Sequence, residues 1–271
     1  MSLANQFAAY TAWRSRLSSH VGEFQGWLNK NELSDGQTDL RLTQLLERLR
    51  EDRLNVAFVA EFSRGKSELI NAIFFADYGN RMLPSSAGRT TMCPTELLFD
   101  ASKQPCIELL PIQTRATNSG VTEYKSFPDE WTVVALDTES PDAMQDALRH
   151  VSETTRVAPE EAARLGFEVG QGEVELYRIG EDGLVEVPRW RHAMINFPHP
   201  LLKQGLVILD TPGLNAIGAE PELTLSQLPN AHAVLFILAA DTGVTQSDLA
   251  IWKEHICGGG TPKRGRMVVM N

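Results

Sequence analysis

The stretch "AEFSRGKSELINAIF" (residues 60–74) directly follows the apolar run "NVAFV" (55–59). That run does not alternate, which is typical of a parallel strand covered on both faces. The residues "SELINAIFF" (67–75) predict a helix. Gly65-Lys66-Ser67 therefore stands where a buried strand passes into a helix, which is the setting of the phosphate-binding P-loop pattern GxxxxGK(S/T).

The first glycine of that pattern is replaced here by Ala60. An alanine forced into a left-handed backbone would cost about 1–2 kcal/mol, whereas each charge-assisted hydrogen bond to a phosphate contributes ~1.5–3 kcal/mol. We therefore expect a weakened loop, not a lost one. Lys66 would reach the β and γ phosphates and Ser67 would bind Mg²⁺. The expected nucleotide-binding residues of this loop are Glu61, Phe62, Ser63, Arg64, Gly65, Lys66, Ser67 and Glu68.

A second motif, "GLVILDTPG" (205–213), places Asp210 at the end of another apolar run. A carboxylate there can bind Mg²⁺, and the N–H of Gly213 can meet the γ phosphate because glycine lets the backbone approach closely. The bland alternative is a turn-forming aspartate. One chain thus contains both a strand followed by Gly-Lys-Ser and a strand followed by Asp-Thr-Pro-Gly, and this combination favours nucleotide binding over chance. We therefore add Asp210 and Gly213 to the expected nucleotide-binding residues.

The loop "LPSSAGRTTMCPTEL" (83–97) lies between the two motifs and is typical of a switch that orders around the γ phosphate. Thr91 would give a hydroxyl to Mg²⁺ and a carbonyl to the attacking water, although an ordinary polar loop is the alternative. The expected metal ligands are thus Ser67, Thr91 and Asp210, and the expected catalytic residues are Lys66, Thr91, Gly213 and Arg64.

Further apolar runs and helix signals predict an α/β domain over residues 53–271. We expect a three-layer P-loop fold with a mostly parallel central sheet, interrupted by an insertion at about 113–190. Ser140-Pro141 and Thr245-x-x-Asp248 read as helix starts. "TELLF" (95–99) and "CIELLPI" (106–112) read as a strand pair, and "GLVILD" (205–210), "AVLFILAA" (233–240) and "RMVVM" (266–270) read as buried strands.

Residues 1–52 predict a helical hairpin ahead of that domain. Large apolar residues recur there at steps of three and four, which marks one face of a helix. We interpret this stripe as core, with an interface as the alternative. Its members are Phe7, Tyr10, Trp13, Leu17, Val21, Phe24 and Leu28.

The net charge of −10 argues against a nucleic-acid partner, because phosphate neutralisation needs a basic surface. The three cysteines are widely spaced and form no CxxC pair, so we expect reduced thiols. The longest apolar run (233–240) is far shorter than the ~20 residues that span a bilayer. The N-terminus has no signal-peptide pattern, and we expect a cytoplasmic protein.

Four segments together resemble the GTPase domain of the dynamin superfamily, particularly its bacterial dynamin-like members. They are residues 61–74 and 83–97, "INFPHPLLKQGLVILDTPGLN" (195–215) and "LAADTGVTQSDL" (238–249). The resemblance implies GTP hydrolysis to GDP with Mg²⁺, homodimerisation through GTPase domains, and membrane contact through parts outside this chain. It also implies a location peripheral to the inner face of the membrane.

Two departures from the family pattern matter. Asn271 would be the first residue of the guanine-reading (N/T)KxD motif, so we expect a longer protein, and guanine specificity rests on the resemblance alone. The third P-loop position is Phe62, which can neither orient water nor offset charge, although Ser63 could help hold a compensating cation. Arg64 or Arg89 could then act as an arginine finger in cis, with a solvated surface arginine as the alternative.

Two rival functions remain open at this point. A nucleotide-regulated scaffold with little hydrolysis is supported by Phe62. A ribosome-assembly GTPase would need an RNA-binding surface, which the acidic charge does not favour.

Overall fold

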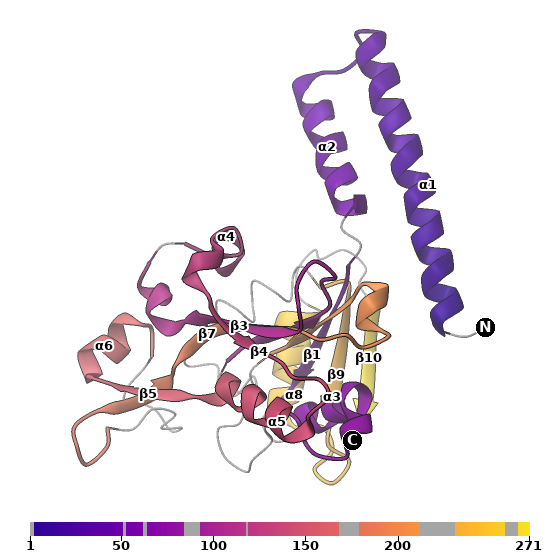
Figure 1. Cartoon of the computed structure of the whole chain (residues 1–271). Coiled ribbons are helices and arrows are strands. Elements are labelled where there is room, and N and C mark those ends of the chain that lie inside the picture. Colours follow the sequence, from indigo (N-terminus) through magenta and orange to yellow (C-terminus); the bar gives the residue numbers. More distant parts are fainter. Residues whose placement is uncertain are drawn as a thin grey trace. The chain divides into compact units, whose positions relative to one another are not determined.

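The structure is a computed structural model that describes residues 3–50, 53–61, 64–83, 93–117, 119–167, 179–211, 231–257 and 265–271. These residues form two compact units, Met1–Leu54 and Asn55–Asn271, and each is described by itself (Figure 1). The sequence prediction divided the chain into residues 1–52 and 53–271.

The first unit is an antiparallel pair of helices, α1 (Leu3–Lys30) and α2 (Gly36–Arg50). The side chain of Asp35 accepts a hydrogen bond from the Thr38 N–H at 2.6 Å and so begins α2. Gln25 on α1 donates to the Asp39 carboxylate on α2 at 2.7 Å. The hairpin is therefore present as expected. Neither helix, nor any other that the structure describes, is long and apolar enough to cross a membrane.

The aromatic stripe of α1 is not a core, and that interpretation was wrong. Tyr10, Trp13 and Phe24 are 42%, 52% and 51% exposed. The second helix has 15 residues against 28 in the first, so it covers only part of the stripe. Leu28 on α1 and Leu46 on α2 are the buried leucines of this unit among its described side chains.

The second unit is built on an eight-stranded sheet whose spatial order is β10-β9-β1-β8-β2-β7-β3-β4 (Figure 1). Parallel pairs join β10 to β9, β9 to β1, and β2 to β7. Antiparallel pairs join β8 to β2, β7 to β3 and β3 to β4. The strands are β1 (Leu54–Ala60), β2 (Thr95–Leu98), β3 (Cys106–Pro111), β4 (Thr132–Ala135), β7 (Trp190–Asn196), β8 (Leu206–Asp210), β9 (Ala233–Leu238) and β10 (Gly265–Met270).

A separate two-stranded sheet pairs β5 (Thr154–Val157) with β6 (Val185–Pro188) in antiparallel fashion. Among the described residues of this unit, the α-helices are α3 (Lys66–Phe74), α4 (Val121–Tyr124), α5 (Pro141–Arg149), α6 (Pro159–Arg164) and α8 (Gln246–Ile251), the last continued by a π-helical turn at Trp252–Ile256. Short 3-10 turns are η1 (Ala76–Tyr78), η2 (Ile112–Ala116), η3 (Pro128–Glu130), η4 (His150–Ser152) and η5 (Leu202–Gln204).

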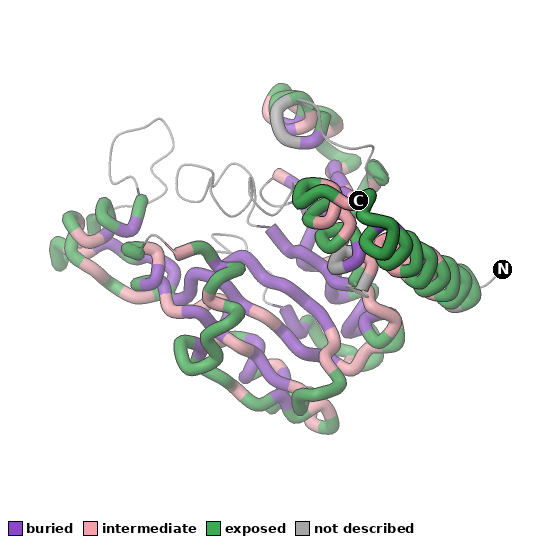
Figure 2. Tube along the Cα trace, turned by 90° about the horizontal axis from the view of Figure 1, so that it is seen from above, coloured by how far each residue is buried: buried purple, intermediate pink, exposed green. Residues whose placement is uncertain are grey.

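The two faces of the main sheet carry two different cores, because neighbouring residues of a strand point to opposite faces. On β1, Phe58 and Ala60 join the core that includes α3 and α5, whereas Ala57 and Val59 join the core that includes α8. The central strands are accordingly buried on both sides (Figure 2). The three-layer α/β P-loop fold is therefore confirmed.

Strands β2 and β3, which were expected to pair, do not. Strand β7 lies between them, parallel to β2 and antiparallel to β3. The apolar pattern hides β7, because its sequence "WRHAMIN" contains Arg191, His192 and Asn196, all of them buried. Each of these polar side chains has hydrogen-bond partners that offset the cost of burial.

Strand β10, which was expected to be buried, is an exposed edge strand, with Met267 and Met270 62% and 67% exposed. Much of the 113–190 stretch also belongs to the main architecture. Strand β4 closes the opposite edge of the sheet, and α5 contributes Met144 and Leu148 to the larger core. A separate small core holds α6, β6 and Phe167.

Candidate nucleotide-binding site

The P-loop connects the end of β1 at Ala60 with the start of α3 at Lys66. Gly65 caps the helix with a left-handed backbone, φ +79°. A Cβ atom at this position would come within 1.9 Å of Nδ2 of Asn271. The left-handed backbone angle favours glycine here, and any larger residue would also make the Asn271 side chain move. The N-terminus of α3 follows directly, and a helix N-terminus is a favourable place for an anion.

Lys66 and Asp210 form the centre of the site. Nζ of Lys66 lies 2.9 Å from Oδ1 of Asp210, the last residue of β8, and both side chains are buried, at 7% and 6% exposed. Apart from this ion pair, neither atom has a hydrogen-bond partner among the described residues. A buried ammonium and carboxylate with spare bonding capacity are suited to receive an anion and a cation between them.

Ser67 and Asp210 are the described residues that could hold Mg²⁺. Ser67 follows Lys66 in the first turn of α3 and is buried at 9% exposed. The described residues contain no cluster of three or more His, Cys, Asp or Glu side chains that would enclose a metal by themselves. Mg²⁺ is usually bound through one or two carboxylates together with substrate phosphates. The Asp210 carboxylate, whose Oδ1 has only its ion pair with Lys66 among the described residues, is therefore suited to bind Mg²⁺ that enters together with a nucleotide.

Asn271 lies against the P-loop. Its Nδ2 donates to the backbone carbonyl of Arg64 at 3.2 Å. Its backbone is fixed by the sheet, because its N–H donates to the Leu238 carbonyl at 2.8 Å and its carbonyl accepts from the Ala240 N–H at 2.8 Å. The expected first residue of a base-reading motif is thus held beside the phosphate-binding turn.

The remaining sequence-predicted residues divide into two groups. Glu61, Arg64 and Glu68 are described: the first two pair with each other, and Glu68 pairs with Arg81 at 3.1 Å on the outside of α3. Phe62, Ser63, Thr91 and Gly213 lie outside the described residues, as does Arg89.

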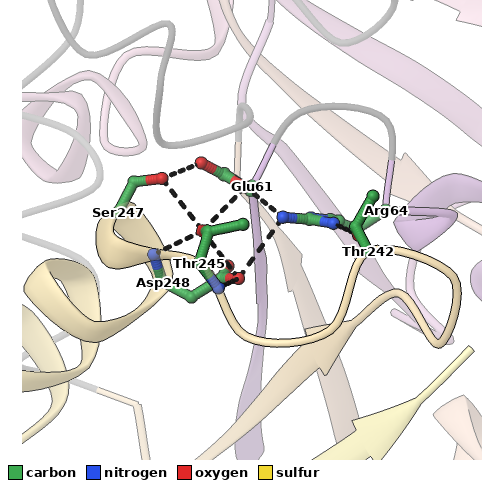
Figure 3. A network of polar contacts seen from close by, with 6 residues as sticks. All are labelled: Glu61, Arg64, Thr242, Thr245, Ser247 and Asp248. Atoms are coloured by element: carbon green, nitrogen blue, oxygen red, sulfur yellow. Dashed lines mark hydrogen bonds and ion pairs between the residues drawn. The ribbon is translucent and has the colours of Figure 1, made fainter.

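The Arg64 side chain, expected as an arginine finger, is engaged elsewhere in this structure. Its guanidinium contacts Glu61, the hydroxyl of Thr242 and, at 3.3 Å, the carboxylate of Asp248 (Figure 3). The sequence indicated Asp248 only as half of a helix cap. Its contact with Arg64 joins residues 184 positions apart, and no local pattern carries that signal.

A family model described as the dynamin family matches residues 56–270, which is nearly the whole second unit. The chain belongs to the dynamin family. Together with the P-loop geometry, this match makes the second unit a dynamin-family GTPase domain, as the sequence resemblance predicted.

One curated relative and two solved structures are similar to this chain. The chain is 24% identical over 260 residues to a bacterial dynamin-like protein of Nostoc punctiforme (strain ATCC 29133 / PCC 73102), covering 91% of the chain and 30% of the relative. Two chains from structures of an oligomerised bacterial dynamin pair, described as providing a mechanism for the long-range sensing and tethering of membranes, are 17% and 18% identical to this chain. They cover 87% and 92% of this chain and 28% and 31% of their own lengths, with TM-scores of 0.45 and 0.43. The chain thus spans under a third of these relatives.

The dynamin-family domain has a second buried ionic cluster, which the sequence did not indicate. Glu96 on β2 accepts from Nζ of Lys125 at 2.7 and 2.8 Å and lies 3.2 Å from Nε2 of His192 on β7. Burial raises the pKa of the Glu96 carboxyl, but the hydrogen bond and charge of His192 and the ammonium of Lys125 outweigh it and lower that pKa to about 2. Glu96 is therefore a carboxylate at every physiological pH.

Proposed function

We propose that this domain binds GTP with Mg²⁺ and hydrolyses it to GDP. The carrying observation is the buried ion pair between Lys66 and Asp210, which brings the P-loop and the end of β8 to within 2.9 Å of each other. A triphosphate–magnesium unit gripped by both motifs accounts for two buried charges that otherwise have unused hydrogen-bonding capacity.

In the proposed reaction the protein positions groups and stabilises charge, without a covalent intermediate. Lys66 and the P-loop N–H groups offset the negative charge that develops at the β–γ bridge. Ser67, Thr91 and Asp210 would bind Mg²⁺, which neutralises phosphate charge when it is bound. Thr91 and Gly213 would orient the attacking water and the γ phosphate, as their motif positions in the sequence predict.

Several finer points belong to the same proposal. Guanine specificity is inferred from the family, and Asn271 is positioned beside the P-loop to take part in it. Nucleotide-dependent homodimerisation is proposed because relatives include an oligomerised bacterial dynamin pair. On the basis of the same relatives, we also propose membrane contact through other parts of a longer protein. We propose a cytoplasmic location peripheral to the inner membrane face for the same reason. No nucleic-acid partner is expected, given the net charge of −10.

The test is binding of GTP, GDP and ATP with Mg²⁺ by titration calorimetry, together with phosphate release, for Lys66→Ala and Ser67→Ala. Loss of one charge-assisted hydrogen bond costs about 1.5–3 kcal/mol of binding free energy, so Lys66→Ala should weaken GTP binding about tenfold to hundredfold. It leaves the buried Asp210 carboxylate unpaired, so a thermal melt must show that the variant is folded.

Ser67→Ala is the gentler variant, because it creates no unpaired charge. It should reduce Mg²⁺-dependent binding and turnover while the melting temperature stays close to that of the parent protein. If folded Lys66→Ala binds GTP as tightly as the parent protein, the proposed function is wrong.

A second candidate is a nucleotide-binding protein with slow hydrolysis. It is favoured by the engagement of Arg64 with Glu61 and Asp248, away from a role as an arginine finger. Single-turnover rates over a range of protein concentrations separate the candidates. Rates that rise with concentration support hydrolysis stimulated by self-association, and slow, concentration-independent rates support the second candidate.

A further inference from the structure

Six side chains form a continuous polar network that we call the P-loop clamp: Glu61, Arg64, Thr242, Thr245, Ser247 and Asp248 (Figure 3). Two of its members, Glu61 and Arg64, lie in the P-loop, and the other four belong to the segment that leads from β9 into the first turn of α8. Figure 3 shows the guanidinium of Arg64 reaching across from the P-loop to this segment.

The carboxylate of Asp248 contacts both Thr245, at the cap of α8, and Arg64, in the P-loop. Its Oδ2 accepts from the backbone N–H of Thr245 and from the Thr245 hydroxyl, both at 2.9 Å, and lies 3.3 Å from Nη2 of Arg64. In return, the Thr245 hydroxyl accepts from the N–H of Asp248 at 3.1 Å, which completes a capping box at the start of α8. The same carboxylate therefore begins α8 and anchors the P-loop.

Glu61 makes the second connection. Its carboxylate contacts the guanidinium of Arg64 and the hydroxyl of Ser247, and it accepts from the Thr245 hydroxyl at 3.4 Å. Arg64, Glu61 and Asp248 are 7%, 10% and 0% exposed. An ionic group so deeply buried has little freedom to leave its partners, since each charge depends on the others for solvation.

The clamp holds the P-loop at two points. Glu61 is the first residue after β1, and Arg64 is the last before Gly65, so the two side chains bracket residues 62–63. The carbonyl of Arg64 is also fixed, by Asn271. A loop whose backbone N–H groups are already oriented loses less conformational freedom when a phosphate binds, and it therefore binds more tightly.

We propose that Arg64 is a positioning residue that sets nucleotide affinity by clamping the P-loop to the N-terminus of α8. It does not act as an arginine finger. The proposal rests on the proposed function, because it concerns the same nucleotide site. Its new elements are the roles of Thr242, Ser247 and Asp248 as supports of the P-loop.

The two roles of Arg64 predict opposite kinetics for Arg64→Ala. A positioning residue contributes equally to ground-state and transition-state binding, so its removal raises KM and leaves kcat within about threefold. We expect the dissociation constants of GTP and GDP to rise by the same factor, about tenfold to hundredfold. Loss of an arginine finger would instead lower kcat by about 10³–10⁵-fold with GDP affinity unchanged.

Graded variants keep the test decisive even if Arg64→Ala does not fold. Ser247→Ala removes only the hydroxyl that contacts Glu61 and should weaken GTP and GDP binding equally, by about twofold to fivefold. Arg64→Lys keeps the positive charge but loses the planar guanidinium group. Its affinities for GTP and GDP should lie between those of the parent protein and those of Arg64→Ala. Asp248→Asn keeps an acceptor for Thr245 and should behave like Arg64→Lys.

Arg191→Ala is the matched control. Arg191 is also a buried arginine, 6% exposed, and it donates to the carbonyls of Thr114 at 2.7 Å and Ser119 at 3.1 Å, outside the clamp. Its removal should lower the melting temperature and leave KM and GDP affinity unchanged.

Each outcome has one meaning. If the clamp variants lower kcat at unchanged GDP affinity, or change neither quantity, the positioning role is wrong. If Lys66→Ala weakens nucleotide binding and the clamp variants do not, the clamp fails and the proposed function stands. If folded Lys66→Ala binds GTP normally, the proposed function itself fails.

Discussion

Two of the buried ionic clusters in the described part of the GTPase domain have similar compositions and join different elements. In the P-loop clamp, Arg64 lies between Glu61 and Asp248 and joins the end of β1 to the start of α8. In the second cluster, Glu96 lies between Lys125 and His192 and joins β2 and β7 to the residue after α4. One is built on the phosphate-binding loop, and the other lies in the antiparallel half of the sheet.

The difference is in what each cluster fixes. The clamp orients a loop whose backbone would bind a ligand, so its energy contributes to binding as well as to folding. The Glu96 cluster joins two strands that are already paired through four backbone positions. It also secures the segment after α4 and contributes to folding alone. Buried charge therefore does not mark a functional site unless it holds a group that meets the ligand.

The largest effect that separates the two clusters is expected from Glu96→Ala. We expect a loss of about 3 kcal/mol in the free energy of unfolding, at the low end of ~3–5 kcal/mol for breaking a buried pair. The side chain of Lys125 is 36% exposed, so water can compensate part of the loss. Denaturant unfolding measures the change, and titration of GDP checks the comparison. A GDP affinity changed by more than about twofold would show that the two clusters are coupled.

The second effect is the pH dependence of the same cluster. The pKa of Glu96 is lowered from 4.5 to about 2, so its contribution to stability is complete above pH 4.5 and is lost as the pH falls toward 2. Over this window the free energy of unfolding should fall by at most about 1.4 kcal/mol per pH unit on account of this one group.

The matched variant for this measurement is Glu96→Gln, which cannot titrate at this position. Its unfolding curve should be less stable at pH 6 and flatter between pH 4.5 and 2. Parallel pH profiles for the two proteins would show that Glu96 does not titrate as its contacts imply.

The sequence predicted those features of the site that depend on residues close together in the chain. Gly65 and Lys66 were found because the Gly-Lys-Ser pattern lies between an apolar run and a helix signal, and Asp210 was found because it ends an apolar run. The capping box at Thr245 and Asp248 was found for the same reason, since its residues are three positions apart.

The rest depends on contacts between distant positions. The clamp joins residues 184 positions apart, and the Glu96–His192 pair joins residues 96 positions apart. Strand β7 was missed because its buried polar residues break the apolar pattern, and β2 was then assigned the wrong neighbour. The stripe of α1 shows the converse: periodicity revealed one apolar face, but not whether another element covers it.

The smallest effect compares two helix caps, one outside the clamp and one within it. Ser140 accepts from the Ala143 N–H at 3.3 Å and begins α5, away from the nucleotide site. Thr245 accepts from the Asp248 N–H at 3.1 Å and begins α8 within the clamp. Replacing either by Ala removes one cap, so Ser140→Ala and Thr245→Ala should each lower the free energy of unfolding by about 1 kcal/mol.

Nucleotide affinity should nevertheless separate the two variants. Thr245→Ala also removes a hydroxyl that contacts Asp248 and Glu61, so the clamp loosens and GTP and GDP binding should weaken by about twofold to fivefold. Ser140→Ala has no such route to the P-loop and should bind both nucleotides as the parent protein does. Equal affinities for the two variants would mean that the α8 cap supports its helix only, and the distinction between the two ionic clusters would then rest on Arg64 by itself.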